Sequence, residues 1–120
     1  ADLAEIYKAD GEIAPGTVVC FGGDAEVTTC MEDGDKIVAG VVSTNPAYLM
    51  NSDADGVAVA LTGRVPAKVT GKIAKGDMLV AAGNGCARAE ADPKMGQVIG
   101  KALEDFDGAE GVIEVVVGRM

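Results

Sequence analysis

Few residues in this sequence are suited to chemistry, and the most suggestive are Ser43 and Asn45, which lie in a Ser-Thr-Asn-Pro segment. The chain of 120 residues contains no His. It therefore has no Ser–His or Cys–His nucleophile pair and no His-ligated zinc. A serine or threonine nucleophile would need Lys, Asp or Glu as its general base, and the spacing around Ser43 identifies no such partner. We therefore predict no catalytic residue and no cofactor.

A second motif with possible chemistry is an acidic turn. Asn51, Asp53 and Asp55 precede Gly56 in the order that begins a calcium-binding loop, in which oxygens at alternate positions converge on one ion. The acidic residue expected at the twelfth position is missing, because Thr62 stands there. We interpret the segment as a solvated acidic loop and predict no metal site.

The three cysteines are Cys20, Cys30 and Cys86, an odd number without Cys-x-x-Cys spacing. We predict free and mostly buried thiols. The alternative is a Cys20–Cys30 disulfide, which requires an oxidising environment and a suitable register across the Gly22-Gly23 turn.

Charge limits the partners of this chain. Nineteen acidic and ten basic residues give a net charge of −9, and the basic residues are scattered. Nucleic acids and anionic membrane surfaces both attract clustered basic residues, so we predict neither partner. The longest apolar runs, about six to eight residues, are far shorter than the roughly 20 of a transmembrane helix.

Turn signals recur about every ten residues along the chain and divide it into short β-branched runs. Pairs such as Asp33-Gly34, Asp55-Gly56 and Asn84-Gly85 suit tight turns because these residues tolerate positive φ. Regularly spaced short strands predict an all-β fold, a small Gly/Val-rich barrel or sandwich. The expected strands are Thr17–Phe21, Glu26–Cys30, Lys36–Val42, Val57–Val69, Met78–Ala81, Ala87–Glu90, Gln97–Leu103 and Val112–Val117.

We expect one domain over residues 1–120, with an N-terminal helical or extended arm at 1–12 and the barrel or sandwich at 13–120. Leu3, Ile6 and Tyr7 have helical spacing, which predicts a short helix over Asp2–Ala9. Pro66 cannot donate to a β-ladder, so its segment is expected at a sheet edge or a bulge.

The chain contains an internal echo. Pro15-Gly16-Thr17-Val18-Val19 resembles Lys75-Gly76-Asp77-Met78-Leu79, and each is followed at the same distance by a glycine, Gly40 or Gly100. Thr62-Gly63-Arg64-Val65 also resembles Val117-Gly118-Arg119-Met120. We predict an internal duplication of a β unit.

A resemblance to a known family is carried by Asp2–Tyr7, Pro15–Val19, Ala39–Asn51, Val59–Pro66, Ile99–Glu104 and Gly111–Arg119. These segments resemble a β domain near the C-terminus of tail-fibre or appendage structural proteins of bacteriophages, especially T4-like phages of marine cyanobacteria. The resemblance implies a virion protein made in the host cytoplasm, which associates with itself as a homotrimer and with other virion proteins.

A more distant resemblance is to the self-cleaving chaperone domain of some phage appendage proteins. The matching positions are Asp2, Glu5, Ser43, Asn45 and Pro46. This resemblance implies an alternative function, in which the domain aligns a fibre and then cuts the chain near its own start. Ala1 in place of Met agrees with cleavage and equally with a piece excised from a longer chain.

Two apolar segments are candidate contacts between chains. Tyr48, Leu49 and Met50 follow the Asn-Pro pair in a loop without clear period, and they alternatively cover the domain's own core. Val112 and Val116 lie on the second face of the last expected strand. A third function, capsid decoration, needs only a rigid acidic β domain and stays open.

Overall fold

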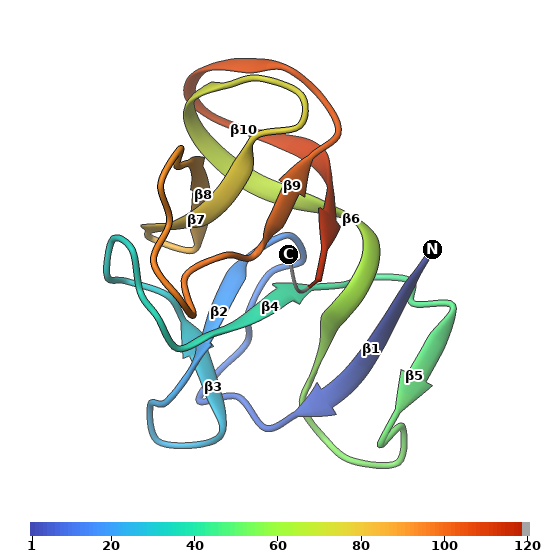
Figure 1. The fold of residues 1–120 in the computed structure, drawn as a ribbon. Coiled ribbons are helices and arrows are strands. Elements are labelled where there is room, and N and C mark those ends of the chain that lie inside the picture. The colour runs from blue at the N-terminus through green and yellow to red at the C-terminus, as the bar shows by residue number, and fades with distance from the viewer. Residues whose placement is uncertain (119–120) are drawn as a thin grey trace.

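The protein consists of β-strands joined by turns (Figure 1). The computed structural model describes residues 1–118; Arg119 and Met120, and with them part of the second predicted echo, lie outside the described range. Residues 1–118 contain no helix, and hence none able to cross a membrane. The strands are β1 (Asp2–Tyr7), β2 (Val18–Phe21), β3 (Val27–Thr29), β4 (Val38–Val42), β5 (Tyr48–Met50), β6 (Val57–Ile73), β7 (Met78–Gly83), β8 (Cys86–Ala89), β9 (Gly100–Ala102) and β10 (Phe106–Val117).

The predicted all-β class is confirmed, and each of the eight expected strands overlaps one observed strand. The predicted helix at Asp2–Ala9 is wrong. Asp2, Ala4 and Ile6 are buried while the residues between them are half-buried, which is the two-residue period of a strand. β1 lies between β5 and β6 and pairs with both, so these strands supply hydrogen-bond partners for its backbone. A segment of this length would not be stable as an isolated helix.

The C-terminal strands form a small closed barrel of five strands. Neighbours pair in the order β6, β8, β7, β9 and β10, and β10 returns to pair with β6 along most of its length. The main core fills the fold from this barrel towards β2 and β4. Its largest fully buried side chains include Leu79, Val65, Val69 and Val115. These side chains are small, which suits a narrow interior.

The remaining strands extend the sheet below this barrel (Figure 1). β6 continues into pairings with β4 and β1, and β4 in turn pairs with β2, which pairs with β3. An isolated parallel bridge between Ala9 and Val27 connects the end of β1 to β3. A smaller core of Val19, Val27, Val42 and Val59 lies in this part.

Strand pairings in the two parts repeat with a separation of 60 residues. Val18 pairs with Val41 in the first part, and Met78 pairs with Lys101 in the second. The parallel bridge of Ala9 has its counterpart in the parallel pairing of Val69 in β6 with β8. The register therefore agrees at positions where the sequence is only loosely similar.

Pro66 lies in β6, which is a central strand and not the expected sheet edge. On one side Pro66 faces Glu114 of β10. On the other side, β1 ends its pairing at Gly63 and β8 joins only at Val69. Pro66 thus lies between the residues of β6 that pair with β1 and the residue that pairs with β8. Its missing N–H donor therefore costs little stability there.

The prediction of free thiols is wrong for two of the cysteines. Cys20 and Cys30 form a disulfide with 5.1 Å between their Cα atoms. Cys20 lies opposite Thr28 in the β2–β3 pair, so Cys20 and Cys30 are diagonal neighbours on one face of the hairpin, and both are buried in the main core. Cys86 is free and buried, as predicted.

Candidate functional site

A hollow of about 350 Å³ lies at the start of β1. It forms where the first residues of the chain, the loop after β4, the middle of β6 and the second half of β10 meet. Its lining contains two carboxylates, one guanidinium, hydroxyls and a carboxamide. The lining residues are Ala1, Asp2, Ser43, Thr44, Asn45, Pro46, Ala47, Arg64, Val65, Pro66 and Glu114.

Backbone hydrogen bonds fix the walls of this hollow. The Ala1 carbonyl accepts a bond from the Arg64 N–H at 3.1 Å, and the Asp2 carbonyl accepts one from the Ala47 N–H at 2.9 Å. The Ser43 N–H donates to the carbonyl of Ala58 in β6 at 2.8 Å. The Asn-Pro loop is therefore tied at both ends, which holds its side chains in place beside β1.

Two residues that border the hollow each have one buried carboxylate oxygen without a hydrogen-bond partner. Asp2 is only 6% exposed, and neither its Oδ2 nor the Oε2 of Glu114 has a hydrogen-bond partner within residues 1–118. Buried polar groups are nearly always paired, because an unpaired one loses its hydration without compensation. This pair of oxygens is the least satisfied polar feature of the described structure.

The structure brings together most of the residues that the distant resemblance selects. Asp2, Ser43, Asn45 and Pro46 all border the hollow. Glu5 does not: its carboxylate accepts a hydrogen bond from the Tyr7 hydroxyl at 3.2 Å. Burial and this carboxylate raise the pKa of Tyr7. The lining offers the Ser43 hydroxyl only carboxylates as proton acceptors.

Sequence reasoning missed Arg64 and Glu114 as members of this site. Both lie on long strands far from the Asn-Pro loop in sequence, and only the β6–β10 register brings them to it. The one available signal was the placement of Glu114 between Val112 and Val116, a charged residue on a partly apolar face.

The candidate contact residues fall into two separate areas. Tyr48, Leu49 and Met50 form β5, which pairs with β1 on one edge, and their exposed fractions are 76%, 38% and 41%. Val112 is exposed and Val116 is half-buried on β10. Val112 lies opposite Lys68, about 17 Å along β6 from Gly63, where β1 begins.

The acidic turn uses its first residue to attach to β1. The Asn51 side-chain nitrogen donates to the Ile6 carbonyl at 3.1 Å, and Asn51 adopts a φ of 58°, which asparagine tolerates better than most residues. Asp53 and Asp55 are exposed on the following turn.

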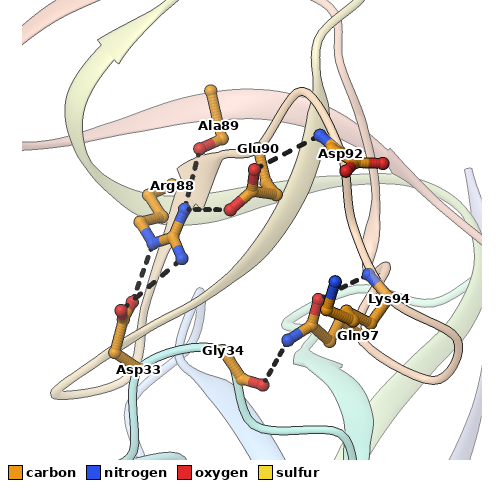
Figure 2. A network of polar contacts seen from close by, with 8 residues as sticks. All are labelled: Asp33, Gly34, Arg88, Ala89, Glu90, Asp92, Lys94 and Gln97. Atoms are coloured by element: carbon orange, nitrogen blue, oxygen red, sulfur yellow. Dashed lines mark hydrogen bonds and ion pairs between the residues drawn. The ribbon is translucent and has the colours of Figure 1, made fainter.

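A polar network on another face joins the two parts of the chain (Figure 2). The Arg88 guanidinium contacts Asp33 at 2.7 Å and Glu90 at 3.0 Å, and the Gln97 amide donates to the Gly34 carbonyl at 2.9 Å. Hydrogen bonding to Asp33 raises the pKa of Arg88. The same guanidinium lowers the pKa of Glu90.

Comparison with known proteins identifies the fold. No family model matches the chain, and no curated protein matches it either. Among solved structures, the chain is similar to the N base of the head fiber protein gp8.5 of bacteriophage phi29. The TM-score is 0.56 at 18% sequence identity, and the match covers 95% of this chain and 92% of the other. The chain therefore shares the fold of a phage head-fibre base.

Proposed function

We propose that this chain is a structural module of a bacteriophage virion that helps to assemble a fibre or appendage by associating with itself, without catalysis. The observation that carries the proposal is the similarity in fold to a head-fibre base over nearly the whole chain. The negative charge and scattered basic residues fit protein partners better than nucleic acid or membrane partners.

Exposed apolar residues on an open sheet edge support self-association. β5 pairs only with β1 within the described residues, and all three of its side chains are exposed. An unprotected edge strand with apolar side chains is a template for pairing with another chain. We propose a homotrimer in which Tyr48, Leu49 and Met50 contact the neighbouring copy, together with Val112 and Val116 of β10.

Sedimentation at micromolar concentration tests this proposal. The wild type should sediment as a trimer, and a Tyr48→Lys, Met50→Lys double variant should shift towards monomer because it places charge in the contact. Met95→Lys is the matched control, since Met95 is 96% exposed on a loop and should leave the trimer intact. A monomeric wild type contradicts the proposal.

The position in the virion has two candidates. The resemblance of the sequence favours the C-terminal end of a tail fibre or appendage, whereas the neighbour in fold is the base of a head fibre, which favours attachment to the capsid, as decoration or as a base. Antibody labelling of virions in the electron microscope separates them, because the label falls either on tail appendages or over the head.

Self-cleavage is a second candidate function, and it is favoured by the meeting of Asp2, Ser43 and Asn45 at one hollow beside Ala1. A longer chain with residues preceding Ala1 tests it by mass spectrometry. Release of a fragment beginning at Ala1, abolished by Ser43→Ala, would support cleavage. An intact chain in both forms contradicts it.

We also propose that the two parts of the chain arose by duplication of a unit of about 60 residues. The matching pairings of β2 with β4 and of β7 with β9 support this origin. So do the two parallel contacts, Ala9 with Val27 and Val69 with Ala87.

A further inference from the structure

We propose that β5 of one copy of this chain covers an apolar surface on a second copy, with Tyr48 as the central side chain of the contact. The receiving surface lies at one end of the strands β1, β6, β4, β2 and β3, and we call it the open end. It consists of Tyr7, Ile13, Phe21 and Val57. This inference rests on the proposed self-association and names the surface that receives β5.

The two parts of the chain contain equivalent rings of strands. In the first ring, β1, β6, β4, β2 and β3 pair in turn, and the isolated parallel bridge connects β3 back to the segment that follows β1. The second ring is the closed barrel of β6, β8, β7, β9 and β10. Tyr7 lies opposite Val57 in the first ring, as Ala67 lies opposite Ile113 in the second. Val57 therefore corresponds to Ile113.

Equivalent apolar positions in the two rings differ in burial. Ile113 is 4% exposed, and Ile73, which follows Ile13 by 60 residues, is 2% exposed. Val57 and Ile13 are only half-buried, although both pack against the smaller core. Side chains of the same kind are thus covered in the second ring and left partly uncovered in the first, within residues 1–118.

Aromatic side chains form the rest of the open end. Phe21 is 44% exposed, and its ring meets that of Tyr7 edge-on, with 5.8 Å between the ring centroids. Exposed apolar side chains that gather in one place are typical of a contact with another molecule. The open end is therefore a candidate receiving surface.

The cover of the second ring shows what the first ring lacks. Phe106 lies opposite Ile73 and packs against the main core, and it belongs to the stretch 103–112 that follows β9. The corresponding stretch of the first part, residues 43–56 between β4 and β6, instead forms β5 along the outer edge of β1 (Figure 1). Its aromatic residue, Tyr48, is 76% exposed. The chain therefore carries an aromatic side chain without a cover as well as a surface that lacks one.

The strand register keeps these two features apart within one chain. Tyr48 lies opposite Leu3, whereas Tyr7 ends β1 four residues later, about 13 Å along the strand. A contact between them is therefore made between copies and joins two different surfaces. Such head-to-tail contacts close into rings when the rotation between copies permits it, which agrees with the proposed homotrimer.

Charge also favours β5 as the segment that covers the open end. Burial is the main cause that raises the pKa of Tyr7, and the nearby carboxylates of Glu5 and Glu26 add to it. Acidic segments of a second copy would be repelled by these carboxylates. Residues 37–52, which include β5, form the longest run without a charged residue in the sequence. The Tyr48 hydroxyl is in addition a hydrogen-bond donor, which suits a surface bordered by carboxylates.

Directed cross-linking of the full chain tests the proposal. Two variants in a Cys86→Ala background each carry one new cysteine at an exposed position, Ala47→Cys beside Tyr48 and Glu12→Cys beside Ile13. Co-expression of the two gives mixed assemblies. Mild oxidation should then yield disulfide-linked pairs that join the two different variants, identified by mass spectrometry of the linked peptides.

The covered end of the second ring supplies the matched control. Asp107→Cys places an exposed cysteine next to Phe106, where the apolar surface is already covered. It should cross-link with Ala47→Cys at least about tenfold less than Glu12→Cys does, because only contacting surfaces have a high effective concentration.

Two substitutions of Tyr48 test the role of charge. Tyr48→Lys and Tyr48→Glu should both weaken association in sedimentation at low salt, and circular dichroism should show that both variants stay folded, since this side chain is exposed. Tyr48→Glu should weaken association at least about fivefold more than Tyr48→Lys, because it meets the carboxylates of the open end.

The outcomes separate this contact from self-association itself. A monomeric wild type overturns both. A trimer in which Asp107→Cys cross-links as readily as Glu12→Cys overturns the contact alone. An equal effect of the two Tyr48 variants also overturns it, because the partner surface of β5 would then not be acidic.

Discussion

Arg88 and Asp33 form an ion pair with 2.7 Å between Nε and Oδ1, and it connects β8 to the loop between β3 and β4 (Figure 2). Exposed pairs contribute up to about 1 kcal/mol, and those with two-point geometry lie at the upper end. We expect Arg88→Gln to lower the unfolding temperature by about 2–4 °C. Differential scanning calorimetry checks this, with Lys36→Gln as an exposed control. An equal loss in both variants would contradict a specific role of the pair.

Glu90 makes the same network sensitive to acid. Arg88 holds the Glu90 pKa below its usual value of 4.5, so the contribution of this pair to stability is fully present above that value. It is lost as pH falls through the lower pKa of the folded state. The difference in unfolding temperature between wild type and Glu90→Gln should therefore be constant from pH 7 to 5 and shrink below pH 4. A difference that widens in acid would show that the carboxylate is not stabilised by Arg88.

We predict that the Cys86 thiol reacts slowly with alkylating reagents and that the charges around it change the reaction rate. Burial is the main cause that raises its pKa, and the Glu110 carboxylate, 3.8 Å from the sulfur, adds to the effect. Glu110→Gln should speed alkylation of the native protein by iodoacetamide about two- to fivefold at pH 8.5, since more thiolate forms. Lys68 lowers the same pKa, so Lys68→Gln should slow the reaction. The opposite signs of the two variants separate charge from a general loosening of the fold.

The Cys20–Cys30 disulfide should contribute about 3 kcal/mol to the free energy of unfolding, the value for closing a loop of this length. The Cys20→Ala, Cys30→Ala double variant should accordingly unfold at lower urea concentration than the oxidised wild type. Because both cysteines are buried, mild reductants that reduce this disulfide in the unfolded chain should leave it intact in the native protein. Thiol counting in denaturant checks the pairing: one reactive thiol is expected and three would contradict it.

Turn chemistry and β-branched runs predicted the strands of this fold well, because local signals determine them. Turn signals such as Gly22-Gly23, Asp33-Gly34 and Asn84-Gly85 separate several of the runs, and hairpin partners are close in sequence. Two strands were missed: Tyr48–Met50, expected as a loop, forms β5, and the expected N-terminal helix is β1. The N-terminal strand was missed for a physical reason. Leu3, Ile6 and Tyr7 have helical spacing, but β5 and β6 offer β1 backbone partners on both edges, and tertiary pairing outweighs a weak local preference.

The candidate site was predictable only in part. Asp2, Ser43 and Asn45 were selected by resemblance, and the structure brings them to one hollow. Arg64 and Glu114 join them through the long β6–β10 ladder, which joins segments about 50 residues apart. The hydrophobic alternation of β10 fixes the face that Glu114 occupies, but it does not show that β10 pairs with β6, because the two strands are far apart in sequence.

Gly40 and Gly100 test how closely neighbouring strands of this fold approach each other. A Cβ on Gly100 would collide with the carbonyl of Val116, and a Cβ on Gly40 would collide with the carbonyl of Ala60. These contacts involve backbone on both sides, so neither can relax through a side-chain rotamer. We expect Gly100→Ala and Gly40→Ala each to destabilise the protein by about 2–4 kcal/mol, the range for overpacked or strained buried sites. Gly11→Ala is the matched control, since nothing lies within 4 Å of its Cβ position, and urea unfolding should show it near neutral. Equal tolerance of alanine at Gly100 and Gly11 would mean that strands β9 and β10 do not approach each other as closely as the structure requires.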